Sequence, residues 1–186
     1  MFVEMNGGEI LVKITVSGPP GSGTSTLVER LVDAYSWVSL NGGDVFRNEA
    51  KNRGLTVGQF SDLCKSDLEV DKSLDNMLKN EIGNPLGAEI IESRLSGWWA
   101  YLMDVDCLRV WVNVSPEECA RRIQNREGGL YEDKLILSQQ RQIDDKKRYQ
   151  ILYDIDLDDM SPYSLIIDAD NIGADEVLSI CLFIHI

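Results

Sequence analysis

The apolar and polar positions along the chain change their period several times, and each change predicts a boundary between elements. A short β-branched run over 10–16 predicts a strand, and a turn rich in glycine and proline follows it. From Thr26 onward the apolar residues recur at helical spacing, with Leu27, Leu31 and Tyr35 on one face. The first part of the chain is therefore expected to form a strand, a tight turn and an amphipathic helix.

The rest of the chain continues this alternation. Short apolar runs predict strands over 37–40, 88–91, 108–114 and 163–167, and helical patterns cover 44–53, 56–82 with interruptions near Gly54 and Ser66, 132–149 and 175–183. A capping box at 115–118, with Pro116 in the first helical position, predicts the start of one more helix. Strands that alternate with helices imply a parallel, doubly wound sheet with helices on both faces. We expect a single domain over 1–186.

Composition narrows the possible partners. The chain has 186 residues and a formal net charge of −13. Phosphate backbones and anionic membrane surfaces both require clustered positive charge, so a nucleic-acid polymer or a membrane is disfavoured as partner. The single histidine, His185, stands one residue from the end, which excludes histidine-based metal sites and Ser-His-Asp triads as the main chemistry.

The expected location follows from the cysteines and the N-terminus. The four cysteines form no CxxC pair, and the first residues have neither a basic region nor a long apolar stretch. We therefore expect buried thiols in a cytoplasmic protein. The oligomeric state stays open.

The most informative segment follows the first strand. It runs through Gly18, Pro19, Pro20, Gly21, Ser22, Gly23, Thr24, Ser25 and Thr26. Its glycines permit a turn in which successive backbone N–H groups converge on an anion, and the next helix adds its positive end. The spacing G-x-x-x-x-G-x-S is that of a phosphate-binding loop, in which Ser25 has the place of the hydroxyl that binds Mg²⁺. Thr24 stands where lysine is usual, and a plain glycine-rich turn is the disfavoured alternative.

The positions of six arginines support phosphate binding. Arg122 and Arg126 are one turn apart on the helix that begins near 115. The other candidates are Arg47 after the second strand, Arg94 just past the third strand, and Arg141, Asp145 and Arg148 on one face of the long polar helix. Guanidinium groups bind phosphate bidentately, and phosphoryl transfer needs charge neutralisation more than it needs a base. Each arginine alone would be interpreted as part of a solvated helix face, but six around one loop favour an anion-binding cleft.

Over nearly its whole length the chain resembles the archaeal-type cytidylate kinases, which belong to the phosphate-loop nucleoside monophosphate kinases. The resemblance is carried by KITVSGPPGSGTST, GDVFRNEAKNRGLTVGQF, EVDKSLD, ESRLSGWW, RRIQNREG and KKRYQILYDIDLDD. That branch commonly has GSGTT, so Thr24 matches it, whereas Ser93 stands where the branch usually has glycine. The resemblance implies a three-layer fold with a five-stranded parallel sheet, a helical insert for the acceptor nucleotide over about 43–82 and a lid over about 126–141.

The resemblance also implies roles for the candidate residues. The loop from Gly18 to Thr26 would hold the phosphates of ATP, Ser25 would help to hold Mg²⁺, and Arg122 and Arg126 would face ATP.

On the acceptor side, Arg47 and Arg94 would hold the phosphate of the monophosphate. Arg141 and Arg148, with Arg94, would stabilise the transferring phosphoryl group, and Asp145 would contact the ribose.

The activity implied is direct transfer from Mg-ATP to CMP or dCMP, giving ADP and CDP or dCDP without a covalent enzyme intermediate. Asp71 and Asp75 are candidates for contact with the cytosine amino group, and a solvated acidic face is the alternative interpretation of this pair. In the absence of the loop lysine, Arg148 or Arg141 would take over part of its contact. A kinase for another nucleoside monophosphate or small metabolite, and a non-catalytic nucleotide-binding module, remain as alternatives.

Overall fold

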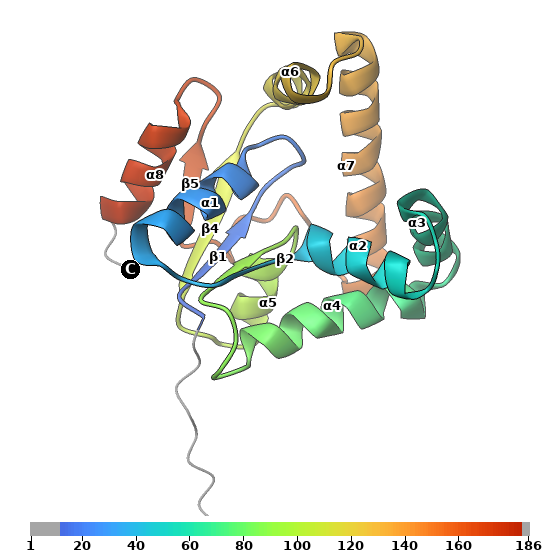
Figure 1. Ribbon diagram of the computed structural model, residues 1–186, viewed down its shortest axis with the longest axis horizontal. Helices are drawn as coiled ribbons and strands as arrows, with labels where there is room; N and C mark the ends of the chain where they lie inside the picture. The colour runs from blue at the N-terminus through green and yellow to red at the C-terminus, as the bar shows by residue number, and fades with distance from the viewer. Residues whose placement is uncertain (1–11, 184–186) are drawn as a thin grey trace, which may run out of the picture.

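The computed structural model describes residues 12–183, and within them five parallel strands form one sheet in the order β2-β3-β1-β4-β5 (Figure 1). The strands are β1 (Ile14–Ser17), β2 (Ser39–Asn41), β3 (Ile90–Glu92), β4 (Leu108–Asn113) and β5 (Leu165–Asp168). Because every pairing is parallel, the carboxyl ends of all five strands lie along the same edge of the sheet. His185 and the start of the strand predicted over 10–16 lie outside the described residues.

Helices cover both faces of this sheet (Figure 1). They are α1 (Thr24–Tyr35), α2 (Gly42–Asn52), α3 (Val57–Ser66), α4 (Leu68–Ile82), α5 (Ser96–Leu102), α6 (Pro116–Glu127), α7 (Tyr131–Tyr153) and α8 (Ala174–Phe183). In β4, Val110 and Val112 are buried in the core that includes α1 and α8. Trp111 between them is buried in the core that includes α5 and α7. This alternation confirms the predicted three-layer α/β fold.

One helix of the described chain was not predicted. The segment SGWWAYL forms α5, and its first five residues are buried, from Ser96 to Ala100. A helix that is buried nearly all round has no polar face, so the apolar and polar pattern cannot reveal it. The long polar helix also continues about one turn further than predicted, because α7 ends at Tyr153.

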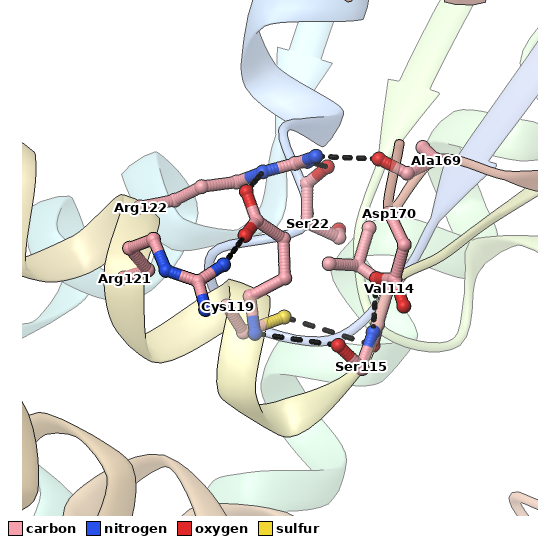
Figure 2. A network of polar contacts seen from close by, with 9 residues as sticks. Ser22, Val114, Ser115, Cys119, Arg121, Arg122, Ala169 and Asp170 are labelled. Atoms are coloured by element: carbon pink, nitrogen blue, oxygen red, sulfur yellow. Dashed lines mark hydrogen bonds and ion pairs between the residues drawn. The ribbon is translucent and has the colours of Figure 1, made fainter. Parts of the chain in front are cut away.

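The capping box predicted at the start of α6 is half formed. The Ser115 hydroxyl accepts a hydrogen bond from the backbone N–H of Glu118 at 3.3 Å. In a complete capping box the Ser115 N–H would donate to the Glu118 carboxylate. Here it donates to Asp170 at 2.7 Å instead, and the Glu118 carboxylate binds Arg121 and Arg122 (Figure 2). The start of α6 is thereby tied to the segment that follows β5.

Two parts of the structure project from the sheet. The insert predicted over about 43–82 coincides with α2, α3 and α4, which lie together beyond the β2 edge (Figure 1). The lid predicted over about 126–141 consists of the end of α6, a turn with Gly128 and Gly129 at φ 72° and 90°, and the first part of α7. Positive φ favours glycine at both positions. Within residues 12–183, no helix is long and apolar enough to cross a membrane.

Candidate active site

The predicted phosphate-binding loop connects β1 to α1 at the carboxyl edge of the sheet. Gly21 and Gly23 have φ values of 91° and 95°, which L side chains rarely adopt. A Cβ atom at Gly21 would lie 2.9 Å from the Cys119 carbonyl oxygen, so this backbone packs directly against α6. Gly23 caps α1 without a side-chain hydrogen bond. The first N–H groups of α1 therefore have no capping side chain and are placed to bind an anion.

The hydroxyl of Ser25 makes a specific contact beneath this loop. It donates a hydrogen bond to Glu92 Oε1 at 2.8 Å, and Glu92, the last residue of β3, is 7% exposed. A hydroxyl next to a carboxylate is a pair of hard oxygen ligands of the kind Mg²⁺ prefers. Sequence reasoning did not include Glu92, although an acid at the carboxyl end of a buried strand is a feature that marks such a site.

A cavity of about 430 Å³ lies beside the loop. Its walls combine the loop with the start of α1, two arginines of α6 and the start of α8; they are Gly21, Ser22, Gly23, Thr24, Ser25, Thr26, Leu27, Arg122, Arg126, Ile172, Gly173, Ala174 and Val177. The two arginines predicted to face the donor nucleotide thus lie next to the loop in the structure.

Arg122 is fixed in this wall by three contacts (Figure 2). Its Nε donates to Glu118 at 2.9 Å, its Nη1 to the Ser22 carbonyl at 2.9 Å, and its Nη2 to the Ala169 carbonyl. Donors on all three guanidinium nitrogens are therefore committed to the protein, so the flat face is the part best suited to a ligand. Arg126, four residues later, pairs with Glu127 and is largely exposed.

A second group of charged side chains is buried between the end of β3, α4 and α7. Asp145 lies between two arginines, with Oδ2 at 3.6 Å from Arg94 Nε and Oδ1 at 3.0 Å from Arg148 Nη2. Arg148 Nε is also 3.1 Å from Asp71 Oδ2. The structure thus brings Arg94, Asp145, Arg148 and Asp71 together from three elements that lie far apart in the sequence.

Arg94 has unused donors in this cluster. Its side chain is 12% exposed, and within residues 12–183 its Nε and Nη1 have no hydrogen-bond partner. Burial lowers the pKa of Arg94, and the charge of Asp145 opposes this effect. Since buried donors are normally paired, this guanidinium is suited to an anionic ligand.

Asp71 and Asp75 lie at the acidic side of the same cluster. Burial raises the pKa of Asp71, and Asp145 raises it further against the effect of Arg148. Burial also raises the pKa of Asp75 to about 6, although Tyr153 donates a hydrogen bond to its Oδ2 at 2.7 Å. The burial of Asp71 disagrees with the alternative interpretation of this pair as a solvated acidic face.

The two remaining candidates have exposed side chains. Arg47 is exposed on α2 and pairs with Asp44 at 2.7 Å. Arg141 is exposed on α7 and makes no ion pair within the described chain. The other candidate arginines form one group at the loop and one between β3, α4 and α7, and Arg94 of the second group lines a cavity of about 440 Å³ together with Pro19 of the loop. The arginine in direct contact with the loop is Arg122, whereas Arg148 is held by Asp71 and Asp145.

The fold and the loop define the class of the protein as a phosphate-loop nucleotide-binding protein. Residues 17–136 match the family described as AAA domain. The structure is similar to that of shikimate kinase from Bacteroides thetaiotaomicron, with a TM-score of 0.59, 15% identity and coverage of 93% of this chain and 97% of that one. It is also similar to a gluconokinase from Sinorhizobium meliloti, with a TM-score of 0.57, 13% identity and coverage of 92% and 89%. At these identities the likeness shows the fold alone.

Sequence relatives define the family within this class. The chain is 36% identical to the cytidylate kinase of Halobacterium salinarum over 169 residues, which cover 91% of this chain and 86% of the relative. It is 36% identical to the cytidylate kinase of Archaeoglobus fulgidus over 174 residues, which cover 92% and 93%. The chain belongs to the cytidylate kinase family, as its sequence motifs predict.

Proposed function

We propose that the protein transfers a phosphoryl group from Mg-ATP to CMP, and to dCMP, giving ADP and CDP or dCDP. The observation that carries the proposal is the position of Arg94, two residues after Glu92 at the end of β3. Glu92 contacts Ser25 of the phosphate-binding loop, while Arg94 offers unused buried donors on the other side. A donor site and an acceptor site would therefore meet at the carboxyl end of one strand.

On the donor side, the backbone N–H groups of the loop bind the phosphates of ATP in this proposal. The flat face of Arg122 stacks on the adenine ring, because three of its five in-plane N–H donors already bind Glu118, Ser22 and Ala169 and hold the group in place. Ser25 and Glu92 are the residues that would hold Mg²⁺, directly or through water. When bound, the cation neutralises charge on the transferred phosphate. Arg126 stands at the open side of the same cavity and adds positive charge.

On the acceptor side, Arg94 binds the phosphate of CMP, and Arg47 adds a second guanidinium from α2. Arg47 is exposed, and among residues 12–183 it pairs with Asp44 on its own helix alone, so its side chain is available to a ligand. Asp145 orients Arg94 and Arg148, and accepts a hydrogen bond from the ribose. Arg141 on α7 stabilises the charge of the transferring group, whereas Arg148, whose Nε lies against Asp71, is assigned to the acceptor nucleotide.

Base recognition is proposed for Asp71 with Arg148. Cytosine carries an amino donor at position 4 beside acceptors at N3 and O2. Asp71 Oδ2 and Arg148 Nε form an ion pair at 3.1 Å, and neither atom has a further polar partner within residues 12–183. They offer an acceptor beside a donor, which complements cytosine. Uracil has an oxygen at position 4, which the Asp71 carboxylate would repel, so UMP is a poorer acceptor.

Transfer is direct and in line, and catalysis comes from positioning and electrostatic stabilisation. No nucleophilic side chain is required. The insert over about 43–82 and the lid over about 126–141 would close over the substrates and exclude water, which suppresses hydrolysis of ATP.

A coupled assay of ADP release tests this function. The protein is supplied with fixed Mg-ATP and with CMP, dCMP, UMP or AMP in turn. The proposal predicts rapid ADP release with CMP and dCMP, and slow release with UMP and AMP. Release only with another acceptor would identify a different kinase, and nucleotide binding without ADP release would identify a non-catalytic module.

A further inference from the structure

Asn41 connects the acceptor insert to the donor site through one carboxylate. It is the last residue of β2 and the N-cap of α2, where its Oδ1 accepts hydrogen bonds from Gly43 N at 2.7 Å and Asp44 N at 3.2 Å. Its Nδ2 donates to Glu92 Oε2. The other oxygen of Glu92 accepts the Ser25 hydroxyl at 2.8 Å. A continuous chain of hydrogen bonds thus runs from the phosphate-binding loop to the first turn of α2.

The carboxylate in the middle of this chain depends on both neighbours. Glu92 is 7% exposed and, within residues 12–183, forms no ion pair with lysine or arginine. Its charge is therefore stabilised by neutral donors, one from the loop and one from Asn41. Because a buried carboxylate has few other partners, a change in the hydrogen bond at one oxygen alters the strength of the hydrogen bond at the other.

The first turn of α2 has little freedom to move away from Glu92. A Cβ atom at Gly42 would lie 2.9 Å from Ser93 Cβ and 3.4 Å from the Glu92 carbonyl oxygen. Arg47 stands one turn later and its side chain lies back against this first turn, since a Cβ atom at Gly43 would lie 3.3 Å from Arg47 Nη1. The orientation of Asn41 therefore sets the start of the helix that presents Arg47.

We propose that Asn41 is a positioning residue that couples occupation of the donor site to affinity for the acceptor's phosphate. This inference rests on the proposed function. A cation bound to a lone pair of Ser25 Oγ would leave the hydroxyl proton on Oγ and directed at Glu92, and this hydrogen bond would strengthen. The Glu92 carboxylate is then fixed, and its second oxygen fixes Asn41 and the first turn of α2. By linkage, an acceptor bound to Arg47 raises the affinity for Mg-ATP by the same factor.

The variant Asn41→Asp separates this coupling from helix capping. Aspartate caps a helix as well as asparagine does, but it places an oxygen, not an N–H donor, against Glu92. Asp67→Asn is the matched control, because Asp67 caps α4 through the Glu69 N–H and has no contact with Glu92. Asn41→Ser, which keeps a capping hydroxyl and loses the amide donor, serves as the second variant.

Calorimetry measures CMP binding with and without a saturating, non-hydrolysable Mg-ATP analogue, and binding of the analogue with and without CMP. We expect each ligand to raise the affinity of the wild-type protein for the other by about tenfold. This factor should fall to about one in Asn41→Asp and Asn41→Ser, and stay unchanged in Asp67→Asn. Full coupling in both Asn41 variants, or none in a wild-type protein that binds both ligands, would overturn the inference alone. A wild-type protein that binds neither ligand would overturn the proposed function.

Discussion

Replacing Arg94 by alanine removes a buried guanidinium from the carboxyl end of β3. Its side chain is 12% exposed, and its Nε and Nη1 have no hydrogen-bond partner within the described residues. In the proposed function these two donors bind the phosphate of CMP. The variant therefore deletes two charge-assisted hydrogen bonds to the acceptor, together with the 3.6 Å ion pair between Nε and Asp145.

The expected effect follows from the strength of such bonds. A hydrogen bond to a charged group contributes about 1.5–3 kcal/mol, so two of them contribute about 3–6 kcal/mol. Each 1.4 kcal/mol corresponds to about a tenfold change. We expect kcat/KM for CMP to fall by about 10²–10⁴-fold, with a higher KM and a lower kcat. Arg94→Lys should lose less, because the charge remains and the planar fork is lost.

The same structure predicts that the fold survives this change. Asp145 keeps its ion pair with Arg148 at 3.0 Å, so it is not left as an unpaired buried charge. The KM for ATP should stay within a few-fold, because the arginine at the loop is Arg122. Steady-state ADP release at varied CMP measures the effect, with the melting temperature as control. A folded variant whose kcat/KM for CMP changes less than threefold would refute the placement of Arg94.

Further changes test the donor site, the acidic cluster and the packing of α5. Arg122→Ala should raise the KM for ATP about tenfold through the lost stacking surface and leave the KM for CMP nearly unchanged. The folded pKa of Asp75 is raised from 3.8 to about 6, so the folded state binds more protons and stability falls as the pH rises through this range. Asp75→Asn keeps an acceptor for Tyr153 and should flatten this profile, with a gain of up to about 3 kcal/mol at pH 7. Gly97→Ala should destabilise the fold by at least about 1–3 kcal/mol, because the new Cβ would lie 2.3 Å from Cε1 of buried Tyr163.

Each of these predictions would be contradicted by one specific result. An Arg122→Ala variant with unchanged ATP kinetics would remove the stacking assignment. Urea unfolding between pH 4 and 7 checks Asp75, and parallel wild-type and variant profiles would contradict its raised pKa. A wild-type melting temperature in Gly97→Ala would contradict the close contact between α5 and Tyr163.

The fold could be predicted from the sequence because its strands are short apolar runs and most of its helices have one polar face. Helix α5 could not be predicted in this way, since Ser96 to Ala100 are buried and the segment has no alternation of apolar and polar residues at helical spacing. The strand predicted over 37–40 lies at 39–41 in the structure, at the edge of the sheet, where the apolar pattern is weakest.

The candidate site was predictable in its residue types and less so in its arrangement. The loop motif predicts the tight turn at Gly21 and Gly23 and the helix that follows it, because the spacing of such a loop is a local property. The contact between Ser25 and Glu92 joins residues that are 67 positions apart, and no local pattern contains it. The pairing of Arg148 with Asp71 likewise depends on how α4 packs beside α7.

A single-turnover experiment with ATP labelled in its γ-phosphate tests the central claim most directly. The protein, in excess over the labelled ATP, is mixed with Mg²⁺ and CMP and quenched within seconds. Direct transfer predicts that the label appears in CDP, with little free phosphate and none bound to the protein. Label in inorganic phosphate alone, or retained on the protein before it reaches CDP, would contradict the account.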